Sequence, residues 1–235
     1  MRALQRHQLA WLTHAGWSAI LARPWDLQAR ACLAHWAMHR LPLVVTRQTH
    51  EEVGEARIAL GLPAPTRWGR RRLALQVPRS ALASLGEFPQ LDAVHDLLPR
   101  PAQPAAQTLR QGLAACRTTA RVFGSYGWQT LSGLDHVRAE SDLDLCVAVD
   151  GARHADAVTA VLQRFDATPL RLDGELAFGG GNGDGGGAGV AWREWAAWRA
   201  GRTRALMVKR LAGACLQYDT AWCETKTKTQ AAVAP

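Results

Sequence analysis

Lysine is nearly absent from this chain of 235 residues, where it stands only at Lys209, Lys226 and Lys228. The formal net charge is nevertheless +8, so arginine carries almost all of the positive charge. Arginine binds phosphate groups through its planar, bidentate fork, which makes a phosphate-bearing or acidic partner plausible. A general compositional bias towards Arg and Ala explains the same count equally well. Composition alone therefore leaves an anionic ligand as one of two interpretations.

Paired cysteines and long apolar runs are also missing. The five cysteines are odd in number and form no C-x-x-C pair, which argues against a disulfide framework and for a reducing compartment. The N-terminal segment has no unbroken apolar stretch typical of a signal peptide, and no run approaches the roughly eighteen apolar residues of a membrane span. We therefore expect a soluble, cytoplasmic protein without a membrane partner.

The chain divides into two parts of mixed α and β character. Residues 1–85 are expected to form a smaller α+β domain, 86–110 a linker, 111–223 a second α+β domain and 224–235 a flexible tail. The linker contains "LLPRPAQPAAQ", whose Pro and Ala content is typical of a linker or an ordered turn. Periodicity predicts helices in "DLQARACLAHWAMHR", residues 108–120, "ARHADAVTAVLQRF" and "VAWREWAAWRA", and strands in "LPLVVTRQ", "RRLALQVP", "ARVFG", "LDLCVAV" and "LRLDGELAF".

Residues 179–189, "GGGNGDGGGAG", contain a G-x-G-x-x-G match. So many glycines produce this match by composition alone. A dinucleotide fold also requires an acidic residue about twenty positions further on, and none is present there. We interpret the segment as a flexible hairpin insertion.

Two aspartates stand at the start of an otherwise apolar strand, in "SDLDLCVAV". Because strand residues alternate between faces, Asp142 and Asp144 share one face while Leu143 and Leu145 take the other. Two carboxylates this close raise each other's pKa unless a cation lies between them, and Mg²⁺ suits such a pair together with phosphate oxygens. The alternative is an exposed strand end without a function.

Upstream, "FGSYG" follows an apolar strand start. Gly124 allows a ligand to approach the backbone closely, and Ser125 offers its hydroxyl and amide to a phosphate oxygen at a helix start. A phosphate-binding turn beside a metal-binding pair predicts a site for a nucleoside triphosphate. In "RLDGEL", Asp173 or Glu175 is expected to supply a third carboxylate for a two-ion site. Asp173 is favoured, which leaves Glu175 to orient a substrate hydroxyl; the alternative is a pair of solvated hairpin charges.

These motifs, in this order, resemble the polymerase β-type nucleotidyltransferase superfamily. More narrowly, the chain is similar to the malonate decarboxylase holo-acyl-carrier-protein synthases, also called phosphoribosyl-dephospho-CoA transferases. The stretches that carry the resemblance are "RVFGSYGWQTLSGL", "SDLDL", "RLDGELAF", "VAWREW", "RHQLAWL", "LPLVVTR" and "IALGLP", which together span nearly the whole chain. The glycine-rich segment departs from the pattern, because a shorter hairpin is expected there, and it puts the local geometry near the third carboxylate in question.

The resemblance implies a nucleotidyltransferase-like mixed sheet with flanking helices, and a specific reaction. Phosphoribosyl-dephospho-CoA would pass from 2′-(5″-triphosphoribosyl)-3′-dephospho-CoA to a serine of the acyl-carrier subunit of malonate decarboxylase, with release of pyrophosphate. Two Mg²⁺ ions on Asp142, Asp144 and the third acid would clamp the triphosphate. The nucleophile belongs to the carrier, and the chain shows no G-x-S-x-G motif. The first domain would hold either the coenzyme or the carrier.

Several cationic and aromatic residues carry two interpretations each. Lys209 is either a phosphate ligand or a lysine that protects a sheet edge, and Arg193 binds phosphate or forms a surface pair with Glu194. The basic cluster "RWGRRRL" is either solvated surface or a docking site for an acidic carrier. Two further sets are ambiguous. Either adenine stacking or a packed helix face explains the first set: Trp192, Trp195 and Trp198. The second set has a spacing that resembles a zinc site but lacks an evident fourth ligand: Cys32, His35 and His39.

Two other functions remain open from the sequence. One keeps the site but uses an ordinary nucleoside triphosphate and moves its nucleotidyl group to a small molecule or a protein. The other is a basic nucleic-acid-binding protein with a decayed site. Motifs for a nucleic-acid groove, RNA-stacking signatures and lysine-rich arms are absent, so this last function ranks lowest and no nucleic-acid partner is expected.

Overall fold

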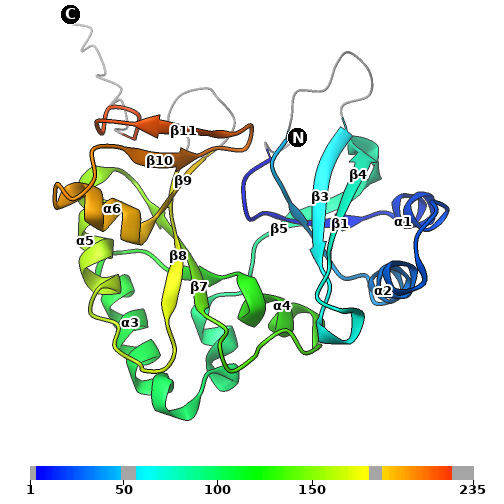
Figure 1. The fold of residues 1–235 in the computed structure, drawn as a ribbon, viewed down its shortest axis with the longest axis horizontal. Helices are drawn as coiled ribbons and strands as arrows, with labels where there is room; N and C mark the ends of the chain where they lie inside the picture. Colours follow the sequence, from blue (N-terminus) through cyan, green and yellow to red (C-terminus); the bar gives the residue numbers. More distant parts are fainter. Residues whose placement is uncertain (1–3, 49–56, 180–186, 224–235) are drawn as a thin grey trace, which may run out of the picture.

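The computed structural model describes residues 4–48, 57–179 and 187–223, which form two sheets with helices on their outer sides (Figure 1). The first sheet is antiparallel in the order β4-β3-β2-β1-β5, and the second is mixed in the order β11-β10-β9-β8-β7-β6. The α+β class with a mixed sheet and flanking helices is therefore confirmed. The expected tail, 224–235, and most of the glycine-rich segment lie outside the described residues.

The first sheet is built from the N-terminal part of the chain. Its strands are β1 (Leu9–Leu12), β2 (Leu43–Val45), β3 (Arg57–Pro63), β4 (Arg72–Pro78) and β5 (Leu82–Gly86). Helices α1 (His14–Leu21) and α2 (Leu27–Met38) lie on its outer side, and short 3₁₀ turns occupy Thr66–Trp68 and Arg79–Ala81. Asp26 caps α2 by accepting a hydrogen bond from the Ala29 amide, which satisfies an otherwise unpaired donor of the first turn.

The second sheet contains the residues that the sequence singled out. Its strands are β6 (Ala120–Val122), β7 (Leu143–Val149), β8 (Leu172–Phe178), β9 (Ala188–Ala191), β10 (Leu206–Lys209) and β11 (Ala214–Gln217). Its helices are α3 (Gln103–Ala115), α4 (Gly124–Ser132), α5 (Ala152–Leu162) and α6 (Trp192–Arg199). Strands β7 and β8 are parallel, with α5 as the crossover between them, and the other pairs are antiparallel. The predicted hairpin around the glycine-rich segment corresponds to the pairing of β8 with β9.

Each sheet has its own hydrophobic core, and α4 connects the two. Leu143, Leu145 and Val147 on β7 are buried in the second core, as strand alternation predicts. Trp128 on α4 belongs instead to the first core, where its ring meets Phe88 edge-on with the centroids 5.4 Å apart. Helix α4 therefore joins the two halves (Figure 1).

The segment expected to be a linker is largely helical. Residues Leu91–Leu97 and Arg100–Ala102 form 3₁₀ turns, and α3 then begins at Gln103. Their apolar side chains, Leu91, Val94, Leu98, Ala102 and Ala106 among them, are buried in the second core. Proline in the first turn of α3 removes no helical hydrogen bond, so a Pro- and Ala-rich sequence is compatible with a packed helix start. Within the described residues, no helix is both long enough and apolar enough to cross a bilayer.

Candidate active site

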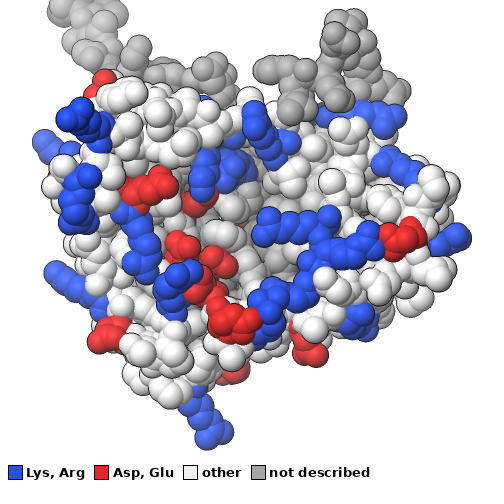
Figure 2. Space-filling model, viewed as in Figure 1, with Lys and Arg blue, Asp and Glu red and all other residues white. Residues whose placement is uncertain are grey.

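Asp144 and Asp173 lie side by side at the same end of the parallel strands. They are register partners in the pairing of β7 with β8, and Asp142 precedes β7 by one residue. Parallel pairing thus brings together carboxylates that are far apart in the sequence. Figure 2 shows acidic side chains gathered near the middle of this face, with Lys and Arg side chains around them.

The surroundings of Asp144 favour its neutral form or a bound cation. Burial, followed by the charges of Asp173 and Asp142, raises the pKa of Asp144 to about 6. Asp142 is itself engaged by Arg171, whose Nε donates to Oδ1 at 3.0 Å. Among the described residues, no three His, Cys, Asp or Glu side chains are grouped closely enough to hold a metal ion in this arrangement. The donors are chemically suited to Mg²⁺, and Asp142 would have to turn from Arg171 to join Asp144 and Asp173.

Glu175 has a different environment from the other carboxylates. Its side chain is only 8% exposed and is bound by Arg6, by His7 at 2.9 Å and by Lys209 at 2.8 Å. Burial alone would raise its pKa, but the hydrogen bonds from His7 and Lys209 and the charge of Arg6 hold the pKa of Glu175 well below its usual range. Glu175 is therefore engaged by Arg6, Lys209 and the His7 ring. Asp173 is the residue of this pair that neighbours Asp144.

Lys209 does not lie at a sheet edge. Strand β10 is flanked by β9 and β11, so the interpretation of Lys209 as an edge-protecting residue is wrong. The ammonium group pairs with Glu175. Arg193 donates through Nη2 to the carbonyl oxygen of Leu172 at 2.8 Å, directly before Asp173, and its guanidinium lies over the Trp192 ring. Arg193 is thus near the third carboxylate, whereas Lys209 is one of the groups that hold Glu175.

The glycine–serine turn lies directly against the aspartates. Gly124 begins α4 with φ +60°, and a Cβ at this position would stand 1.9 Å from Oδ2 of Asp144. The amide of Phe123 donates to the carbonyl of Asp144 at 3.0 Å, which fixes the turn to the start of β7. Only glycine allows both this backbone conformation and this approach. The turn at Gly124 is therefore in direct contact with Asp144.

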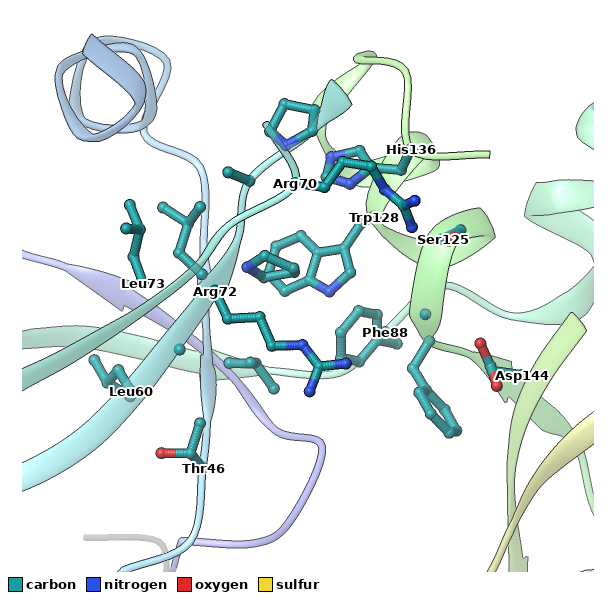
Figure 3. A pocket seen from close by; sticks show the side chains of 18 of the residues that line it. Thr46, Leu60, Arg70, Arg72, Leu73, Phe88, Ser125, Trp128, His136 and Asp144 are labelled. Carbon is teal, nitrogen blue, oxygen red and sulfur yellow. The ribbon is translucent and has the colours of Figure 1, made fainter. Parts of the chain in front are cut away.

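A cavity of about 750 Å³ opens from this site towards the first sheet (Figure 3). Gly124, Ser125 and Asp144 line one end of it. The rest of the wall comes largely from β2, β3 and β4, and it includes Trp128 together with Arg70 and Arg72 of the basic cluster "RWGRRRL". Other lining residues were not identified by any sequence motif as belonging to a site: His7, Thr46, Phe88 and His136. A cavity of this size accommodates a cofactor-sized ligand. Its lining residues come from both halves of the chain, so sequence spacing gave no signal for them.

The remaining candidate sets are explained by packing. Trp195 is fully buried, and its ring packs on Phe178 and Trp198 at centroid distances of 5.4 and 5.5 Å. Cys32 is fully buried in the first core, where burial raises its pKa to about 12. The His35 ring packs against His39 at a centroid distance of 4.2 Å. These contacts correspond to a packed helix face and to core packing, and neither set lines the cavity.

Comparison with known proteins assigns the chain to a family. Two family models match, the phosphoribosyl-dephospho-CoA transferase MdcG N-terminal domain over residues 5–88 and its C-terminal domain over 85–220. A phosphoribosyl-dephospho-CoA transferase of Bradyrhizobium diazoefficiens is 38% identical over 80% of each chain. One of Xanthomonas axonopodis pv. citri is 36% identical over 87% of this chain and 89% of its own. No solved structure matches. With both of its halves matched, this chain belongs to the phosphoribosyl-dephospho-CoA transferase family.

Proposed function

We propose that the protein transfers phosphoribosyl-dephospho-CoA from 2′-(5″-triphosphoribosyl)-3′-dephospho-CoA to a serine hydroxyl of the malonate decarboxylase acyl-carrier subunit. The serine oxygen forms a bond to the α-phosphorus, the α–β phosphoanhydride bond breaks, and pyrophosphate leaves with the electron pair. The observation that carries the proposal is the position of Asp144, which stands beside Asp173 and against the Gly124 turn at one end of the cavity.

The residues at this end have separate roles in the proposed reaction. Asp142, Asp144 and Asp173 would hold two Mg²⁺ ions, which when bound supply charge neutralisation at the triphosphate and lower the pKa of the attacking hydroxyl. Gly124 and Ser125 line the cavity where the leaving phosphates would lie, at the start of α4 where the helix dipole favours anions. Arg171, 67% exposed, would exchange Asp142 for a phosphate oxygen when the substrate binds.

The test is to incubate the protein with Mg²⁺, the triphosphoribosyl coenzyme and the apo carrier, and to measure the mass of the carrier. We expect the carrier to gain the mass of one phosphoribosyl-dephospho-CoA group. Asp144→Asn and Asp142→Asn should each abolish the gain, as should EDTA. Asp92→Asn is the control, because Asp92 forms an exposed surface pair with Arg110 and does not line the cavity.

Three results would overturn the proposal. If the carrier keeps its mass while the protein moves a nucleotidyl group from ATP to another acceptor, the substrate is an ordinary nucleoside triphosphate. If Asp142→Asn and Asp144→Asn both retain full transfer, the carboxylates are not the reactive end of the site. Binding of nucleic acid with a steep salt dependence that ignores both substitutions would indicate the non-catalytic function instead.

A further inference from the structure

The basic cluster "RWGRRRL" is divided by the structure into residues with different partners. Arg67 lies over the Trp68 ring, 3.7 Å from its centroid, and Arg71 pairs with Asp26 at 2.6 Å. Arg70 and Arg72 line the cavity instead. In the described part of the chain their guanidinium groups have no carboxylate partner and no hydrogen-bond acceptor. Two of the four arginines are therefore available to a ligand.

The two free arginines reach into the cavity from the same strand start. Figure 3 shows Arg70 extending between His136 and Ser125, and Arg72 extending across the cavity beside Phe88. Arg70 lies in the turn before β4 with φ +55°, and Arg72 is the first residue of β4. Both side chains line the same cavity, which lets both guanidinium groups face one ligand. Unpaired arginines that converge on a concave surface are typical of a site for phosphate oxygens.

The surfaces around these arginines are mostly apolar. Leu60, Leu62 and Leu73 from the first sheet line the cavity together with Phe88 and Trp128. Such a surface favours rings and alkyl chains over a fully hydrated anion, because burial of apolar surface on binding stabilises the complex. The ligand should therefore be anionic at one point along its length and apolar or aromatic elsewhere.

His136 adds an independent indication of a ligand. It is only 7% exposed, lines the cavity, and its Nε2 atom is buried without a hydrogen-bond partner. Burial, followed by the charge of Arg70, lowers the pKa of His136 to about 4, so the ring is neutral at pH 7. An unpaired buried polar atom is costly, and a ligand that donates or accepts a hydrogen bond here would remove that cost.

We propose that the cavity wall formed by the first sheet binds the dephospho-CoA portion of the substrate, with Arg70 and Arg72 on its diphosphate and the apolar surfaces against its adenine and pantetheine arm. The inference rests on the proposed function. Of the two roles open for the first domain, it favours binding of the coenzyme over binding of the carrier. The diphosphate then lies on the arginines while the triphosphate lies at Asp144, so the reacting and non-reacting phosphates are bound separately. A recess of about 750 Å³ suits a small molecule, whereas docking of a carrier protein requires an extended surface.

The test measures dephospho-CoA binding to the full chain by calorimetry. Dephospho-CoA lacks the triphosphate and cannot be transferred, so it probes this wall alone. Arg70→Ala and Arg72→Ala should each weaken binding about tenfold or more, because each loses a charge-assisted contact. Arg72→Lys should recover only part of the affinity, since lysine lacks the bidentate fork. Arg57→Ala is the matched control, because Arg57 lies at the far end of the β3–β4 pair and does not line the cavity.

The outcomes separate this inference from the proposed function. If dephospho-CoA binds in an Arg70- and Arg72-dependent manner but the carrier gains no mass, the subsite stands and the proposed reaction falls. If the double variant transfers with an unchanged KM for the coenzyme, the reaction stands and the subsite is refuted. The subsite is also refuted if the wild type does not bind dephospho-CoA, or if the substitutions weaken only binding of the apo carrier.

Discussion

At the residue scale, the environment of Asp144 disfavours its ionised form. Its carboxyl group is half-buried beside Asp173, and its pKa of about 6 lies above the ordinary value of 3.8. A raised carboxyl pKa means that the folded state favours the proton. The stabilising contribution is complete below about pH 4 and is lost as the pH rises through 6. At pH 7 the ionised Asp144 therefore destabilises the fold.

Replacement of Asp144 by Asn should remove this cost. We expect Asp144→Asn to raise the free energy of unfolding at pH 7 by about 2 kcal/mol and to have little effect at pH 4. Urea unfolding of both proteins at the two pH values measures the difference, in which the other titrating groups cancel. Addition of Mg²⁺ should reduce the difference in free energy of unfolding between the two proteins at pH 7, because the ion would stabilise the wild type alone. A variant less stable than wild type at pH 7 contradicts the prediction.

The carboxylate of Asp144 also leaves no room for a side chain at position 124. We expect Gly124→Ala to abolish transfer and to lower stability by about 2–4 kcal/mol, because φ is +60° and the new Cβ would overlap Oδ2 of Asp144. Gly133→Ala is the control, since Gly133 has φ +67° at the end of α4 and its added Cβ would meet nothing within 4 Å. The control should cost about 1 kcal/mol and keep activity. Equal losses in the two variants, measured by calorimetry and transfer assay, would refute the contact.

At the scale of elements, β8 holds the N-terminal segment onto the second sheet. Glu175 on β8 is bound by Arg6 and His7, which precede β1, and by Lys209 on β10. His7 also lines the cavity, and its ring packs on Phe123 with the centroids 4.4 Å apart. One buried carboxylate therefore orients the segment that leads into the first sheet, next to the turn at Gly124.

Loss of the Glu175 charge should loosen this connection. Glu175→Gln keeps the shape but leaves Arg6 and Lys209 without their counter-ion, so we expect about 3 kcal/mol of destabilisation in urea. Transfer should fall as well, because His7 would lose its orienting partner. Glu194→Gln on the exposed face of α6 should change neither quantity. Unaltered stability of Glu175→Gln would show that the cluster contributes nothing net.

Element prediction succeeded where one sequence pattern decided the structure. The alternation in "LDLCVAV" and "LRLDGELAF" predicts β7 and β8, and the periodicity of "ARHADAVTAVLQRF" predicts α5. Strands β1 and β5 were not anticipated, because their four or five residues carry too little pattern to distinguish them from loop. The helical turns at residues 91–102 were also missed, since their proline content resembles a linker and only burial against the second core stabilises them.

At the scale of the whole molecule, the cavity requires both sheets. Its reactive end belongs to α4 and β7, its other walls belong to β2, β3 and β4, and Trp128 on α4 is part of the first core. The net charge of +8 adds a general attraction for an anionic coenzyme. A ligand bound in the cavity must therefore stabilise both halves together.

Hydrogen exchange tests this coupling. Dephospho-CoA should slow amide exchange in β3 and β4 and also at the start of α4, because it contacts both sides and is released when either side opens. Helix α3, which does not line the cavity, should change little and serves as the internal control. Protection confined to one sheet would show that the ligand does not bridge the two halves.

The sequence by itself determined strands β6, β7 and β8 and helix α5 of the second sheet, together with the aspartates at the start of β7. Local alternation fixes which face Asp142 and Asp144 share, and the glycine turn follows from the φ that only Gly adopts freely. Tertiary structure decided the partners. Strand register set Asp173 beside Asp144, and chain packing brought Arg6, His7 and Lys209 to Glu175. The meeting of two sheets placed Arg70, Arg72 and His136 around one cavity. Those contacts join residues far apart in the chain, so their geometry depends on packing that no local pattern encodes.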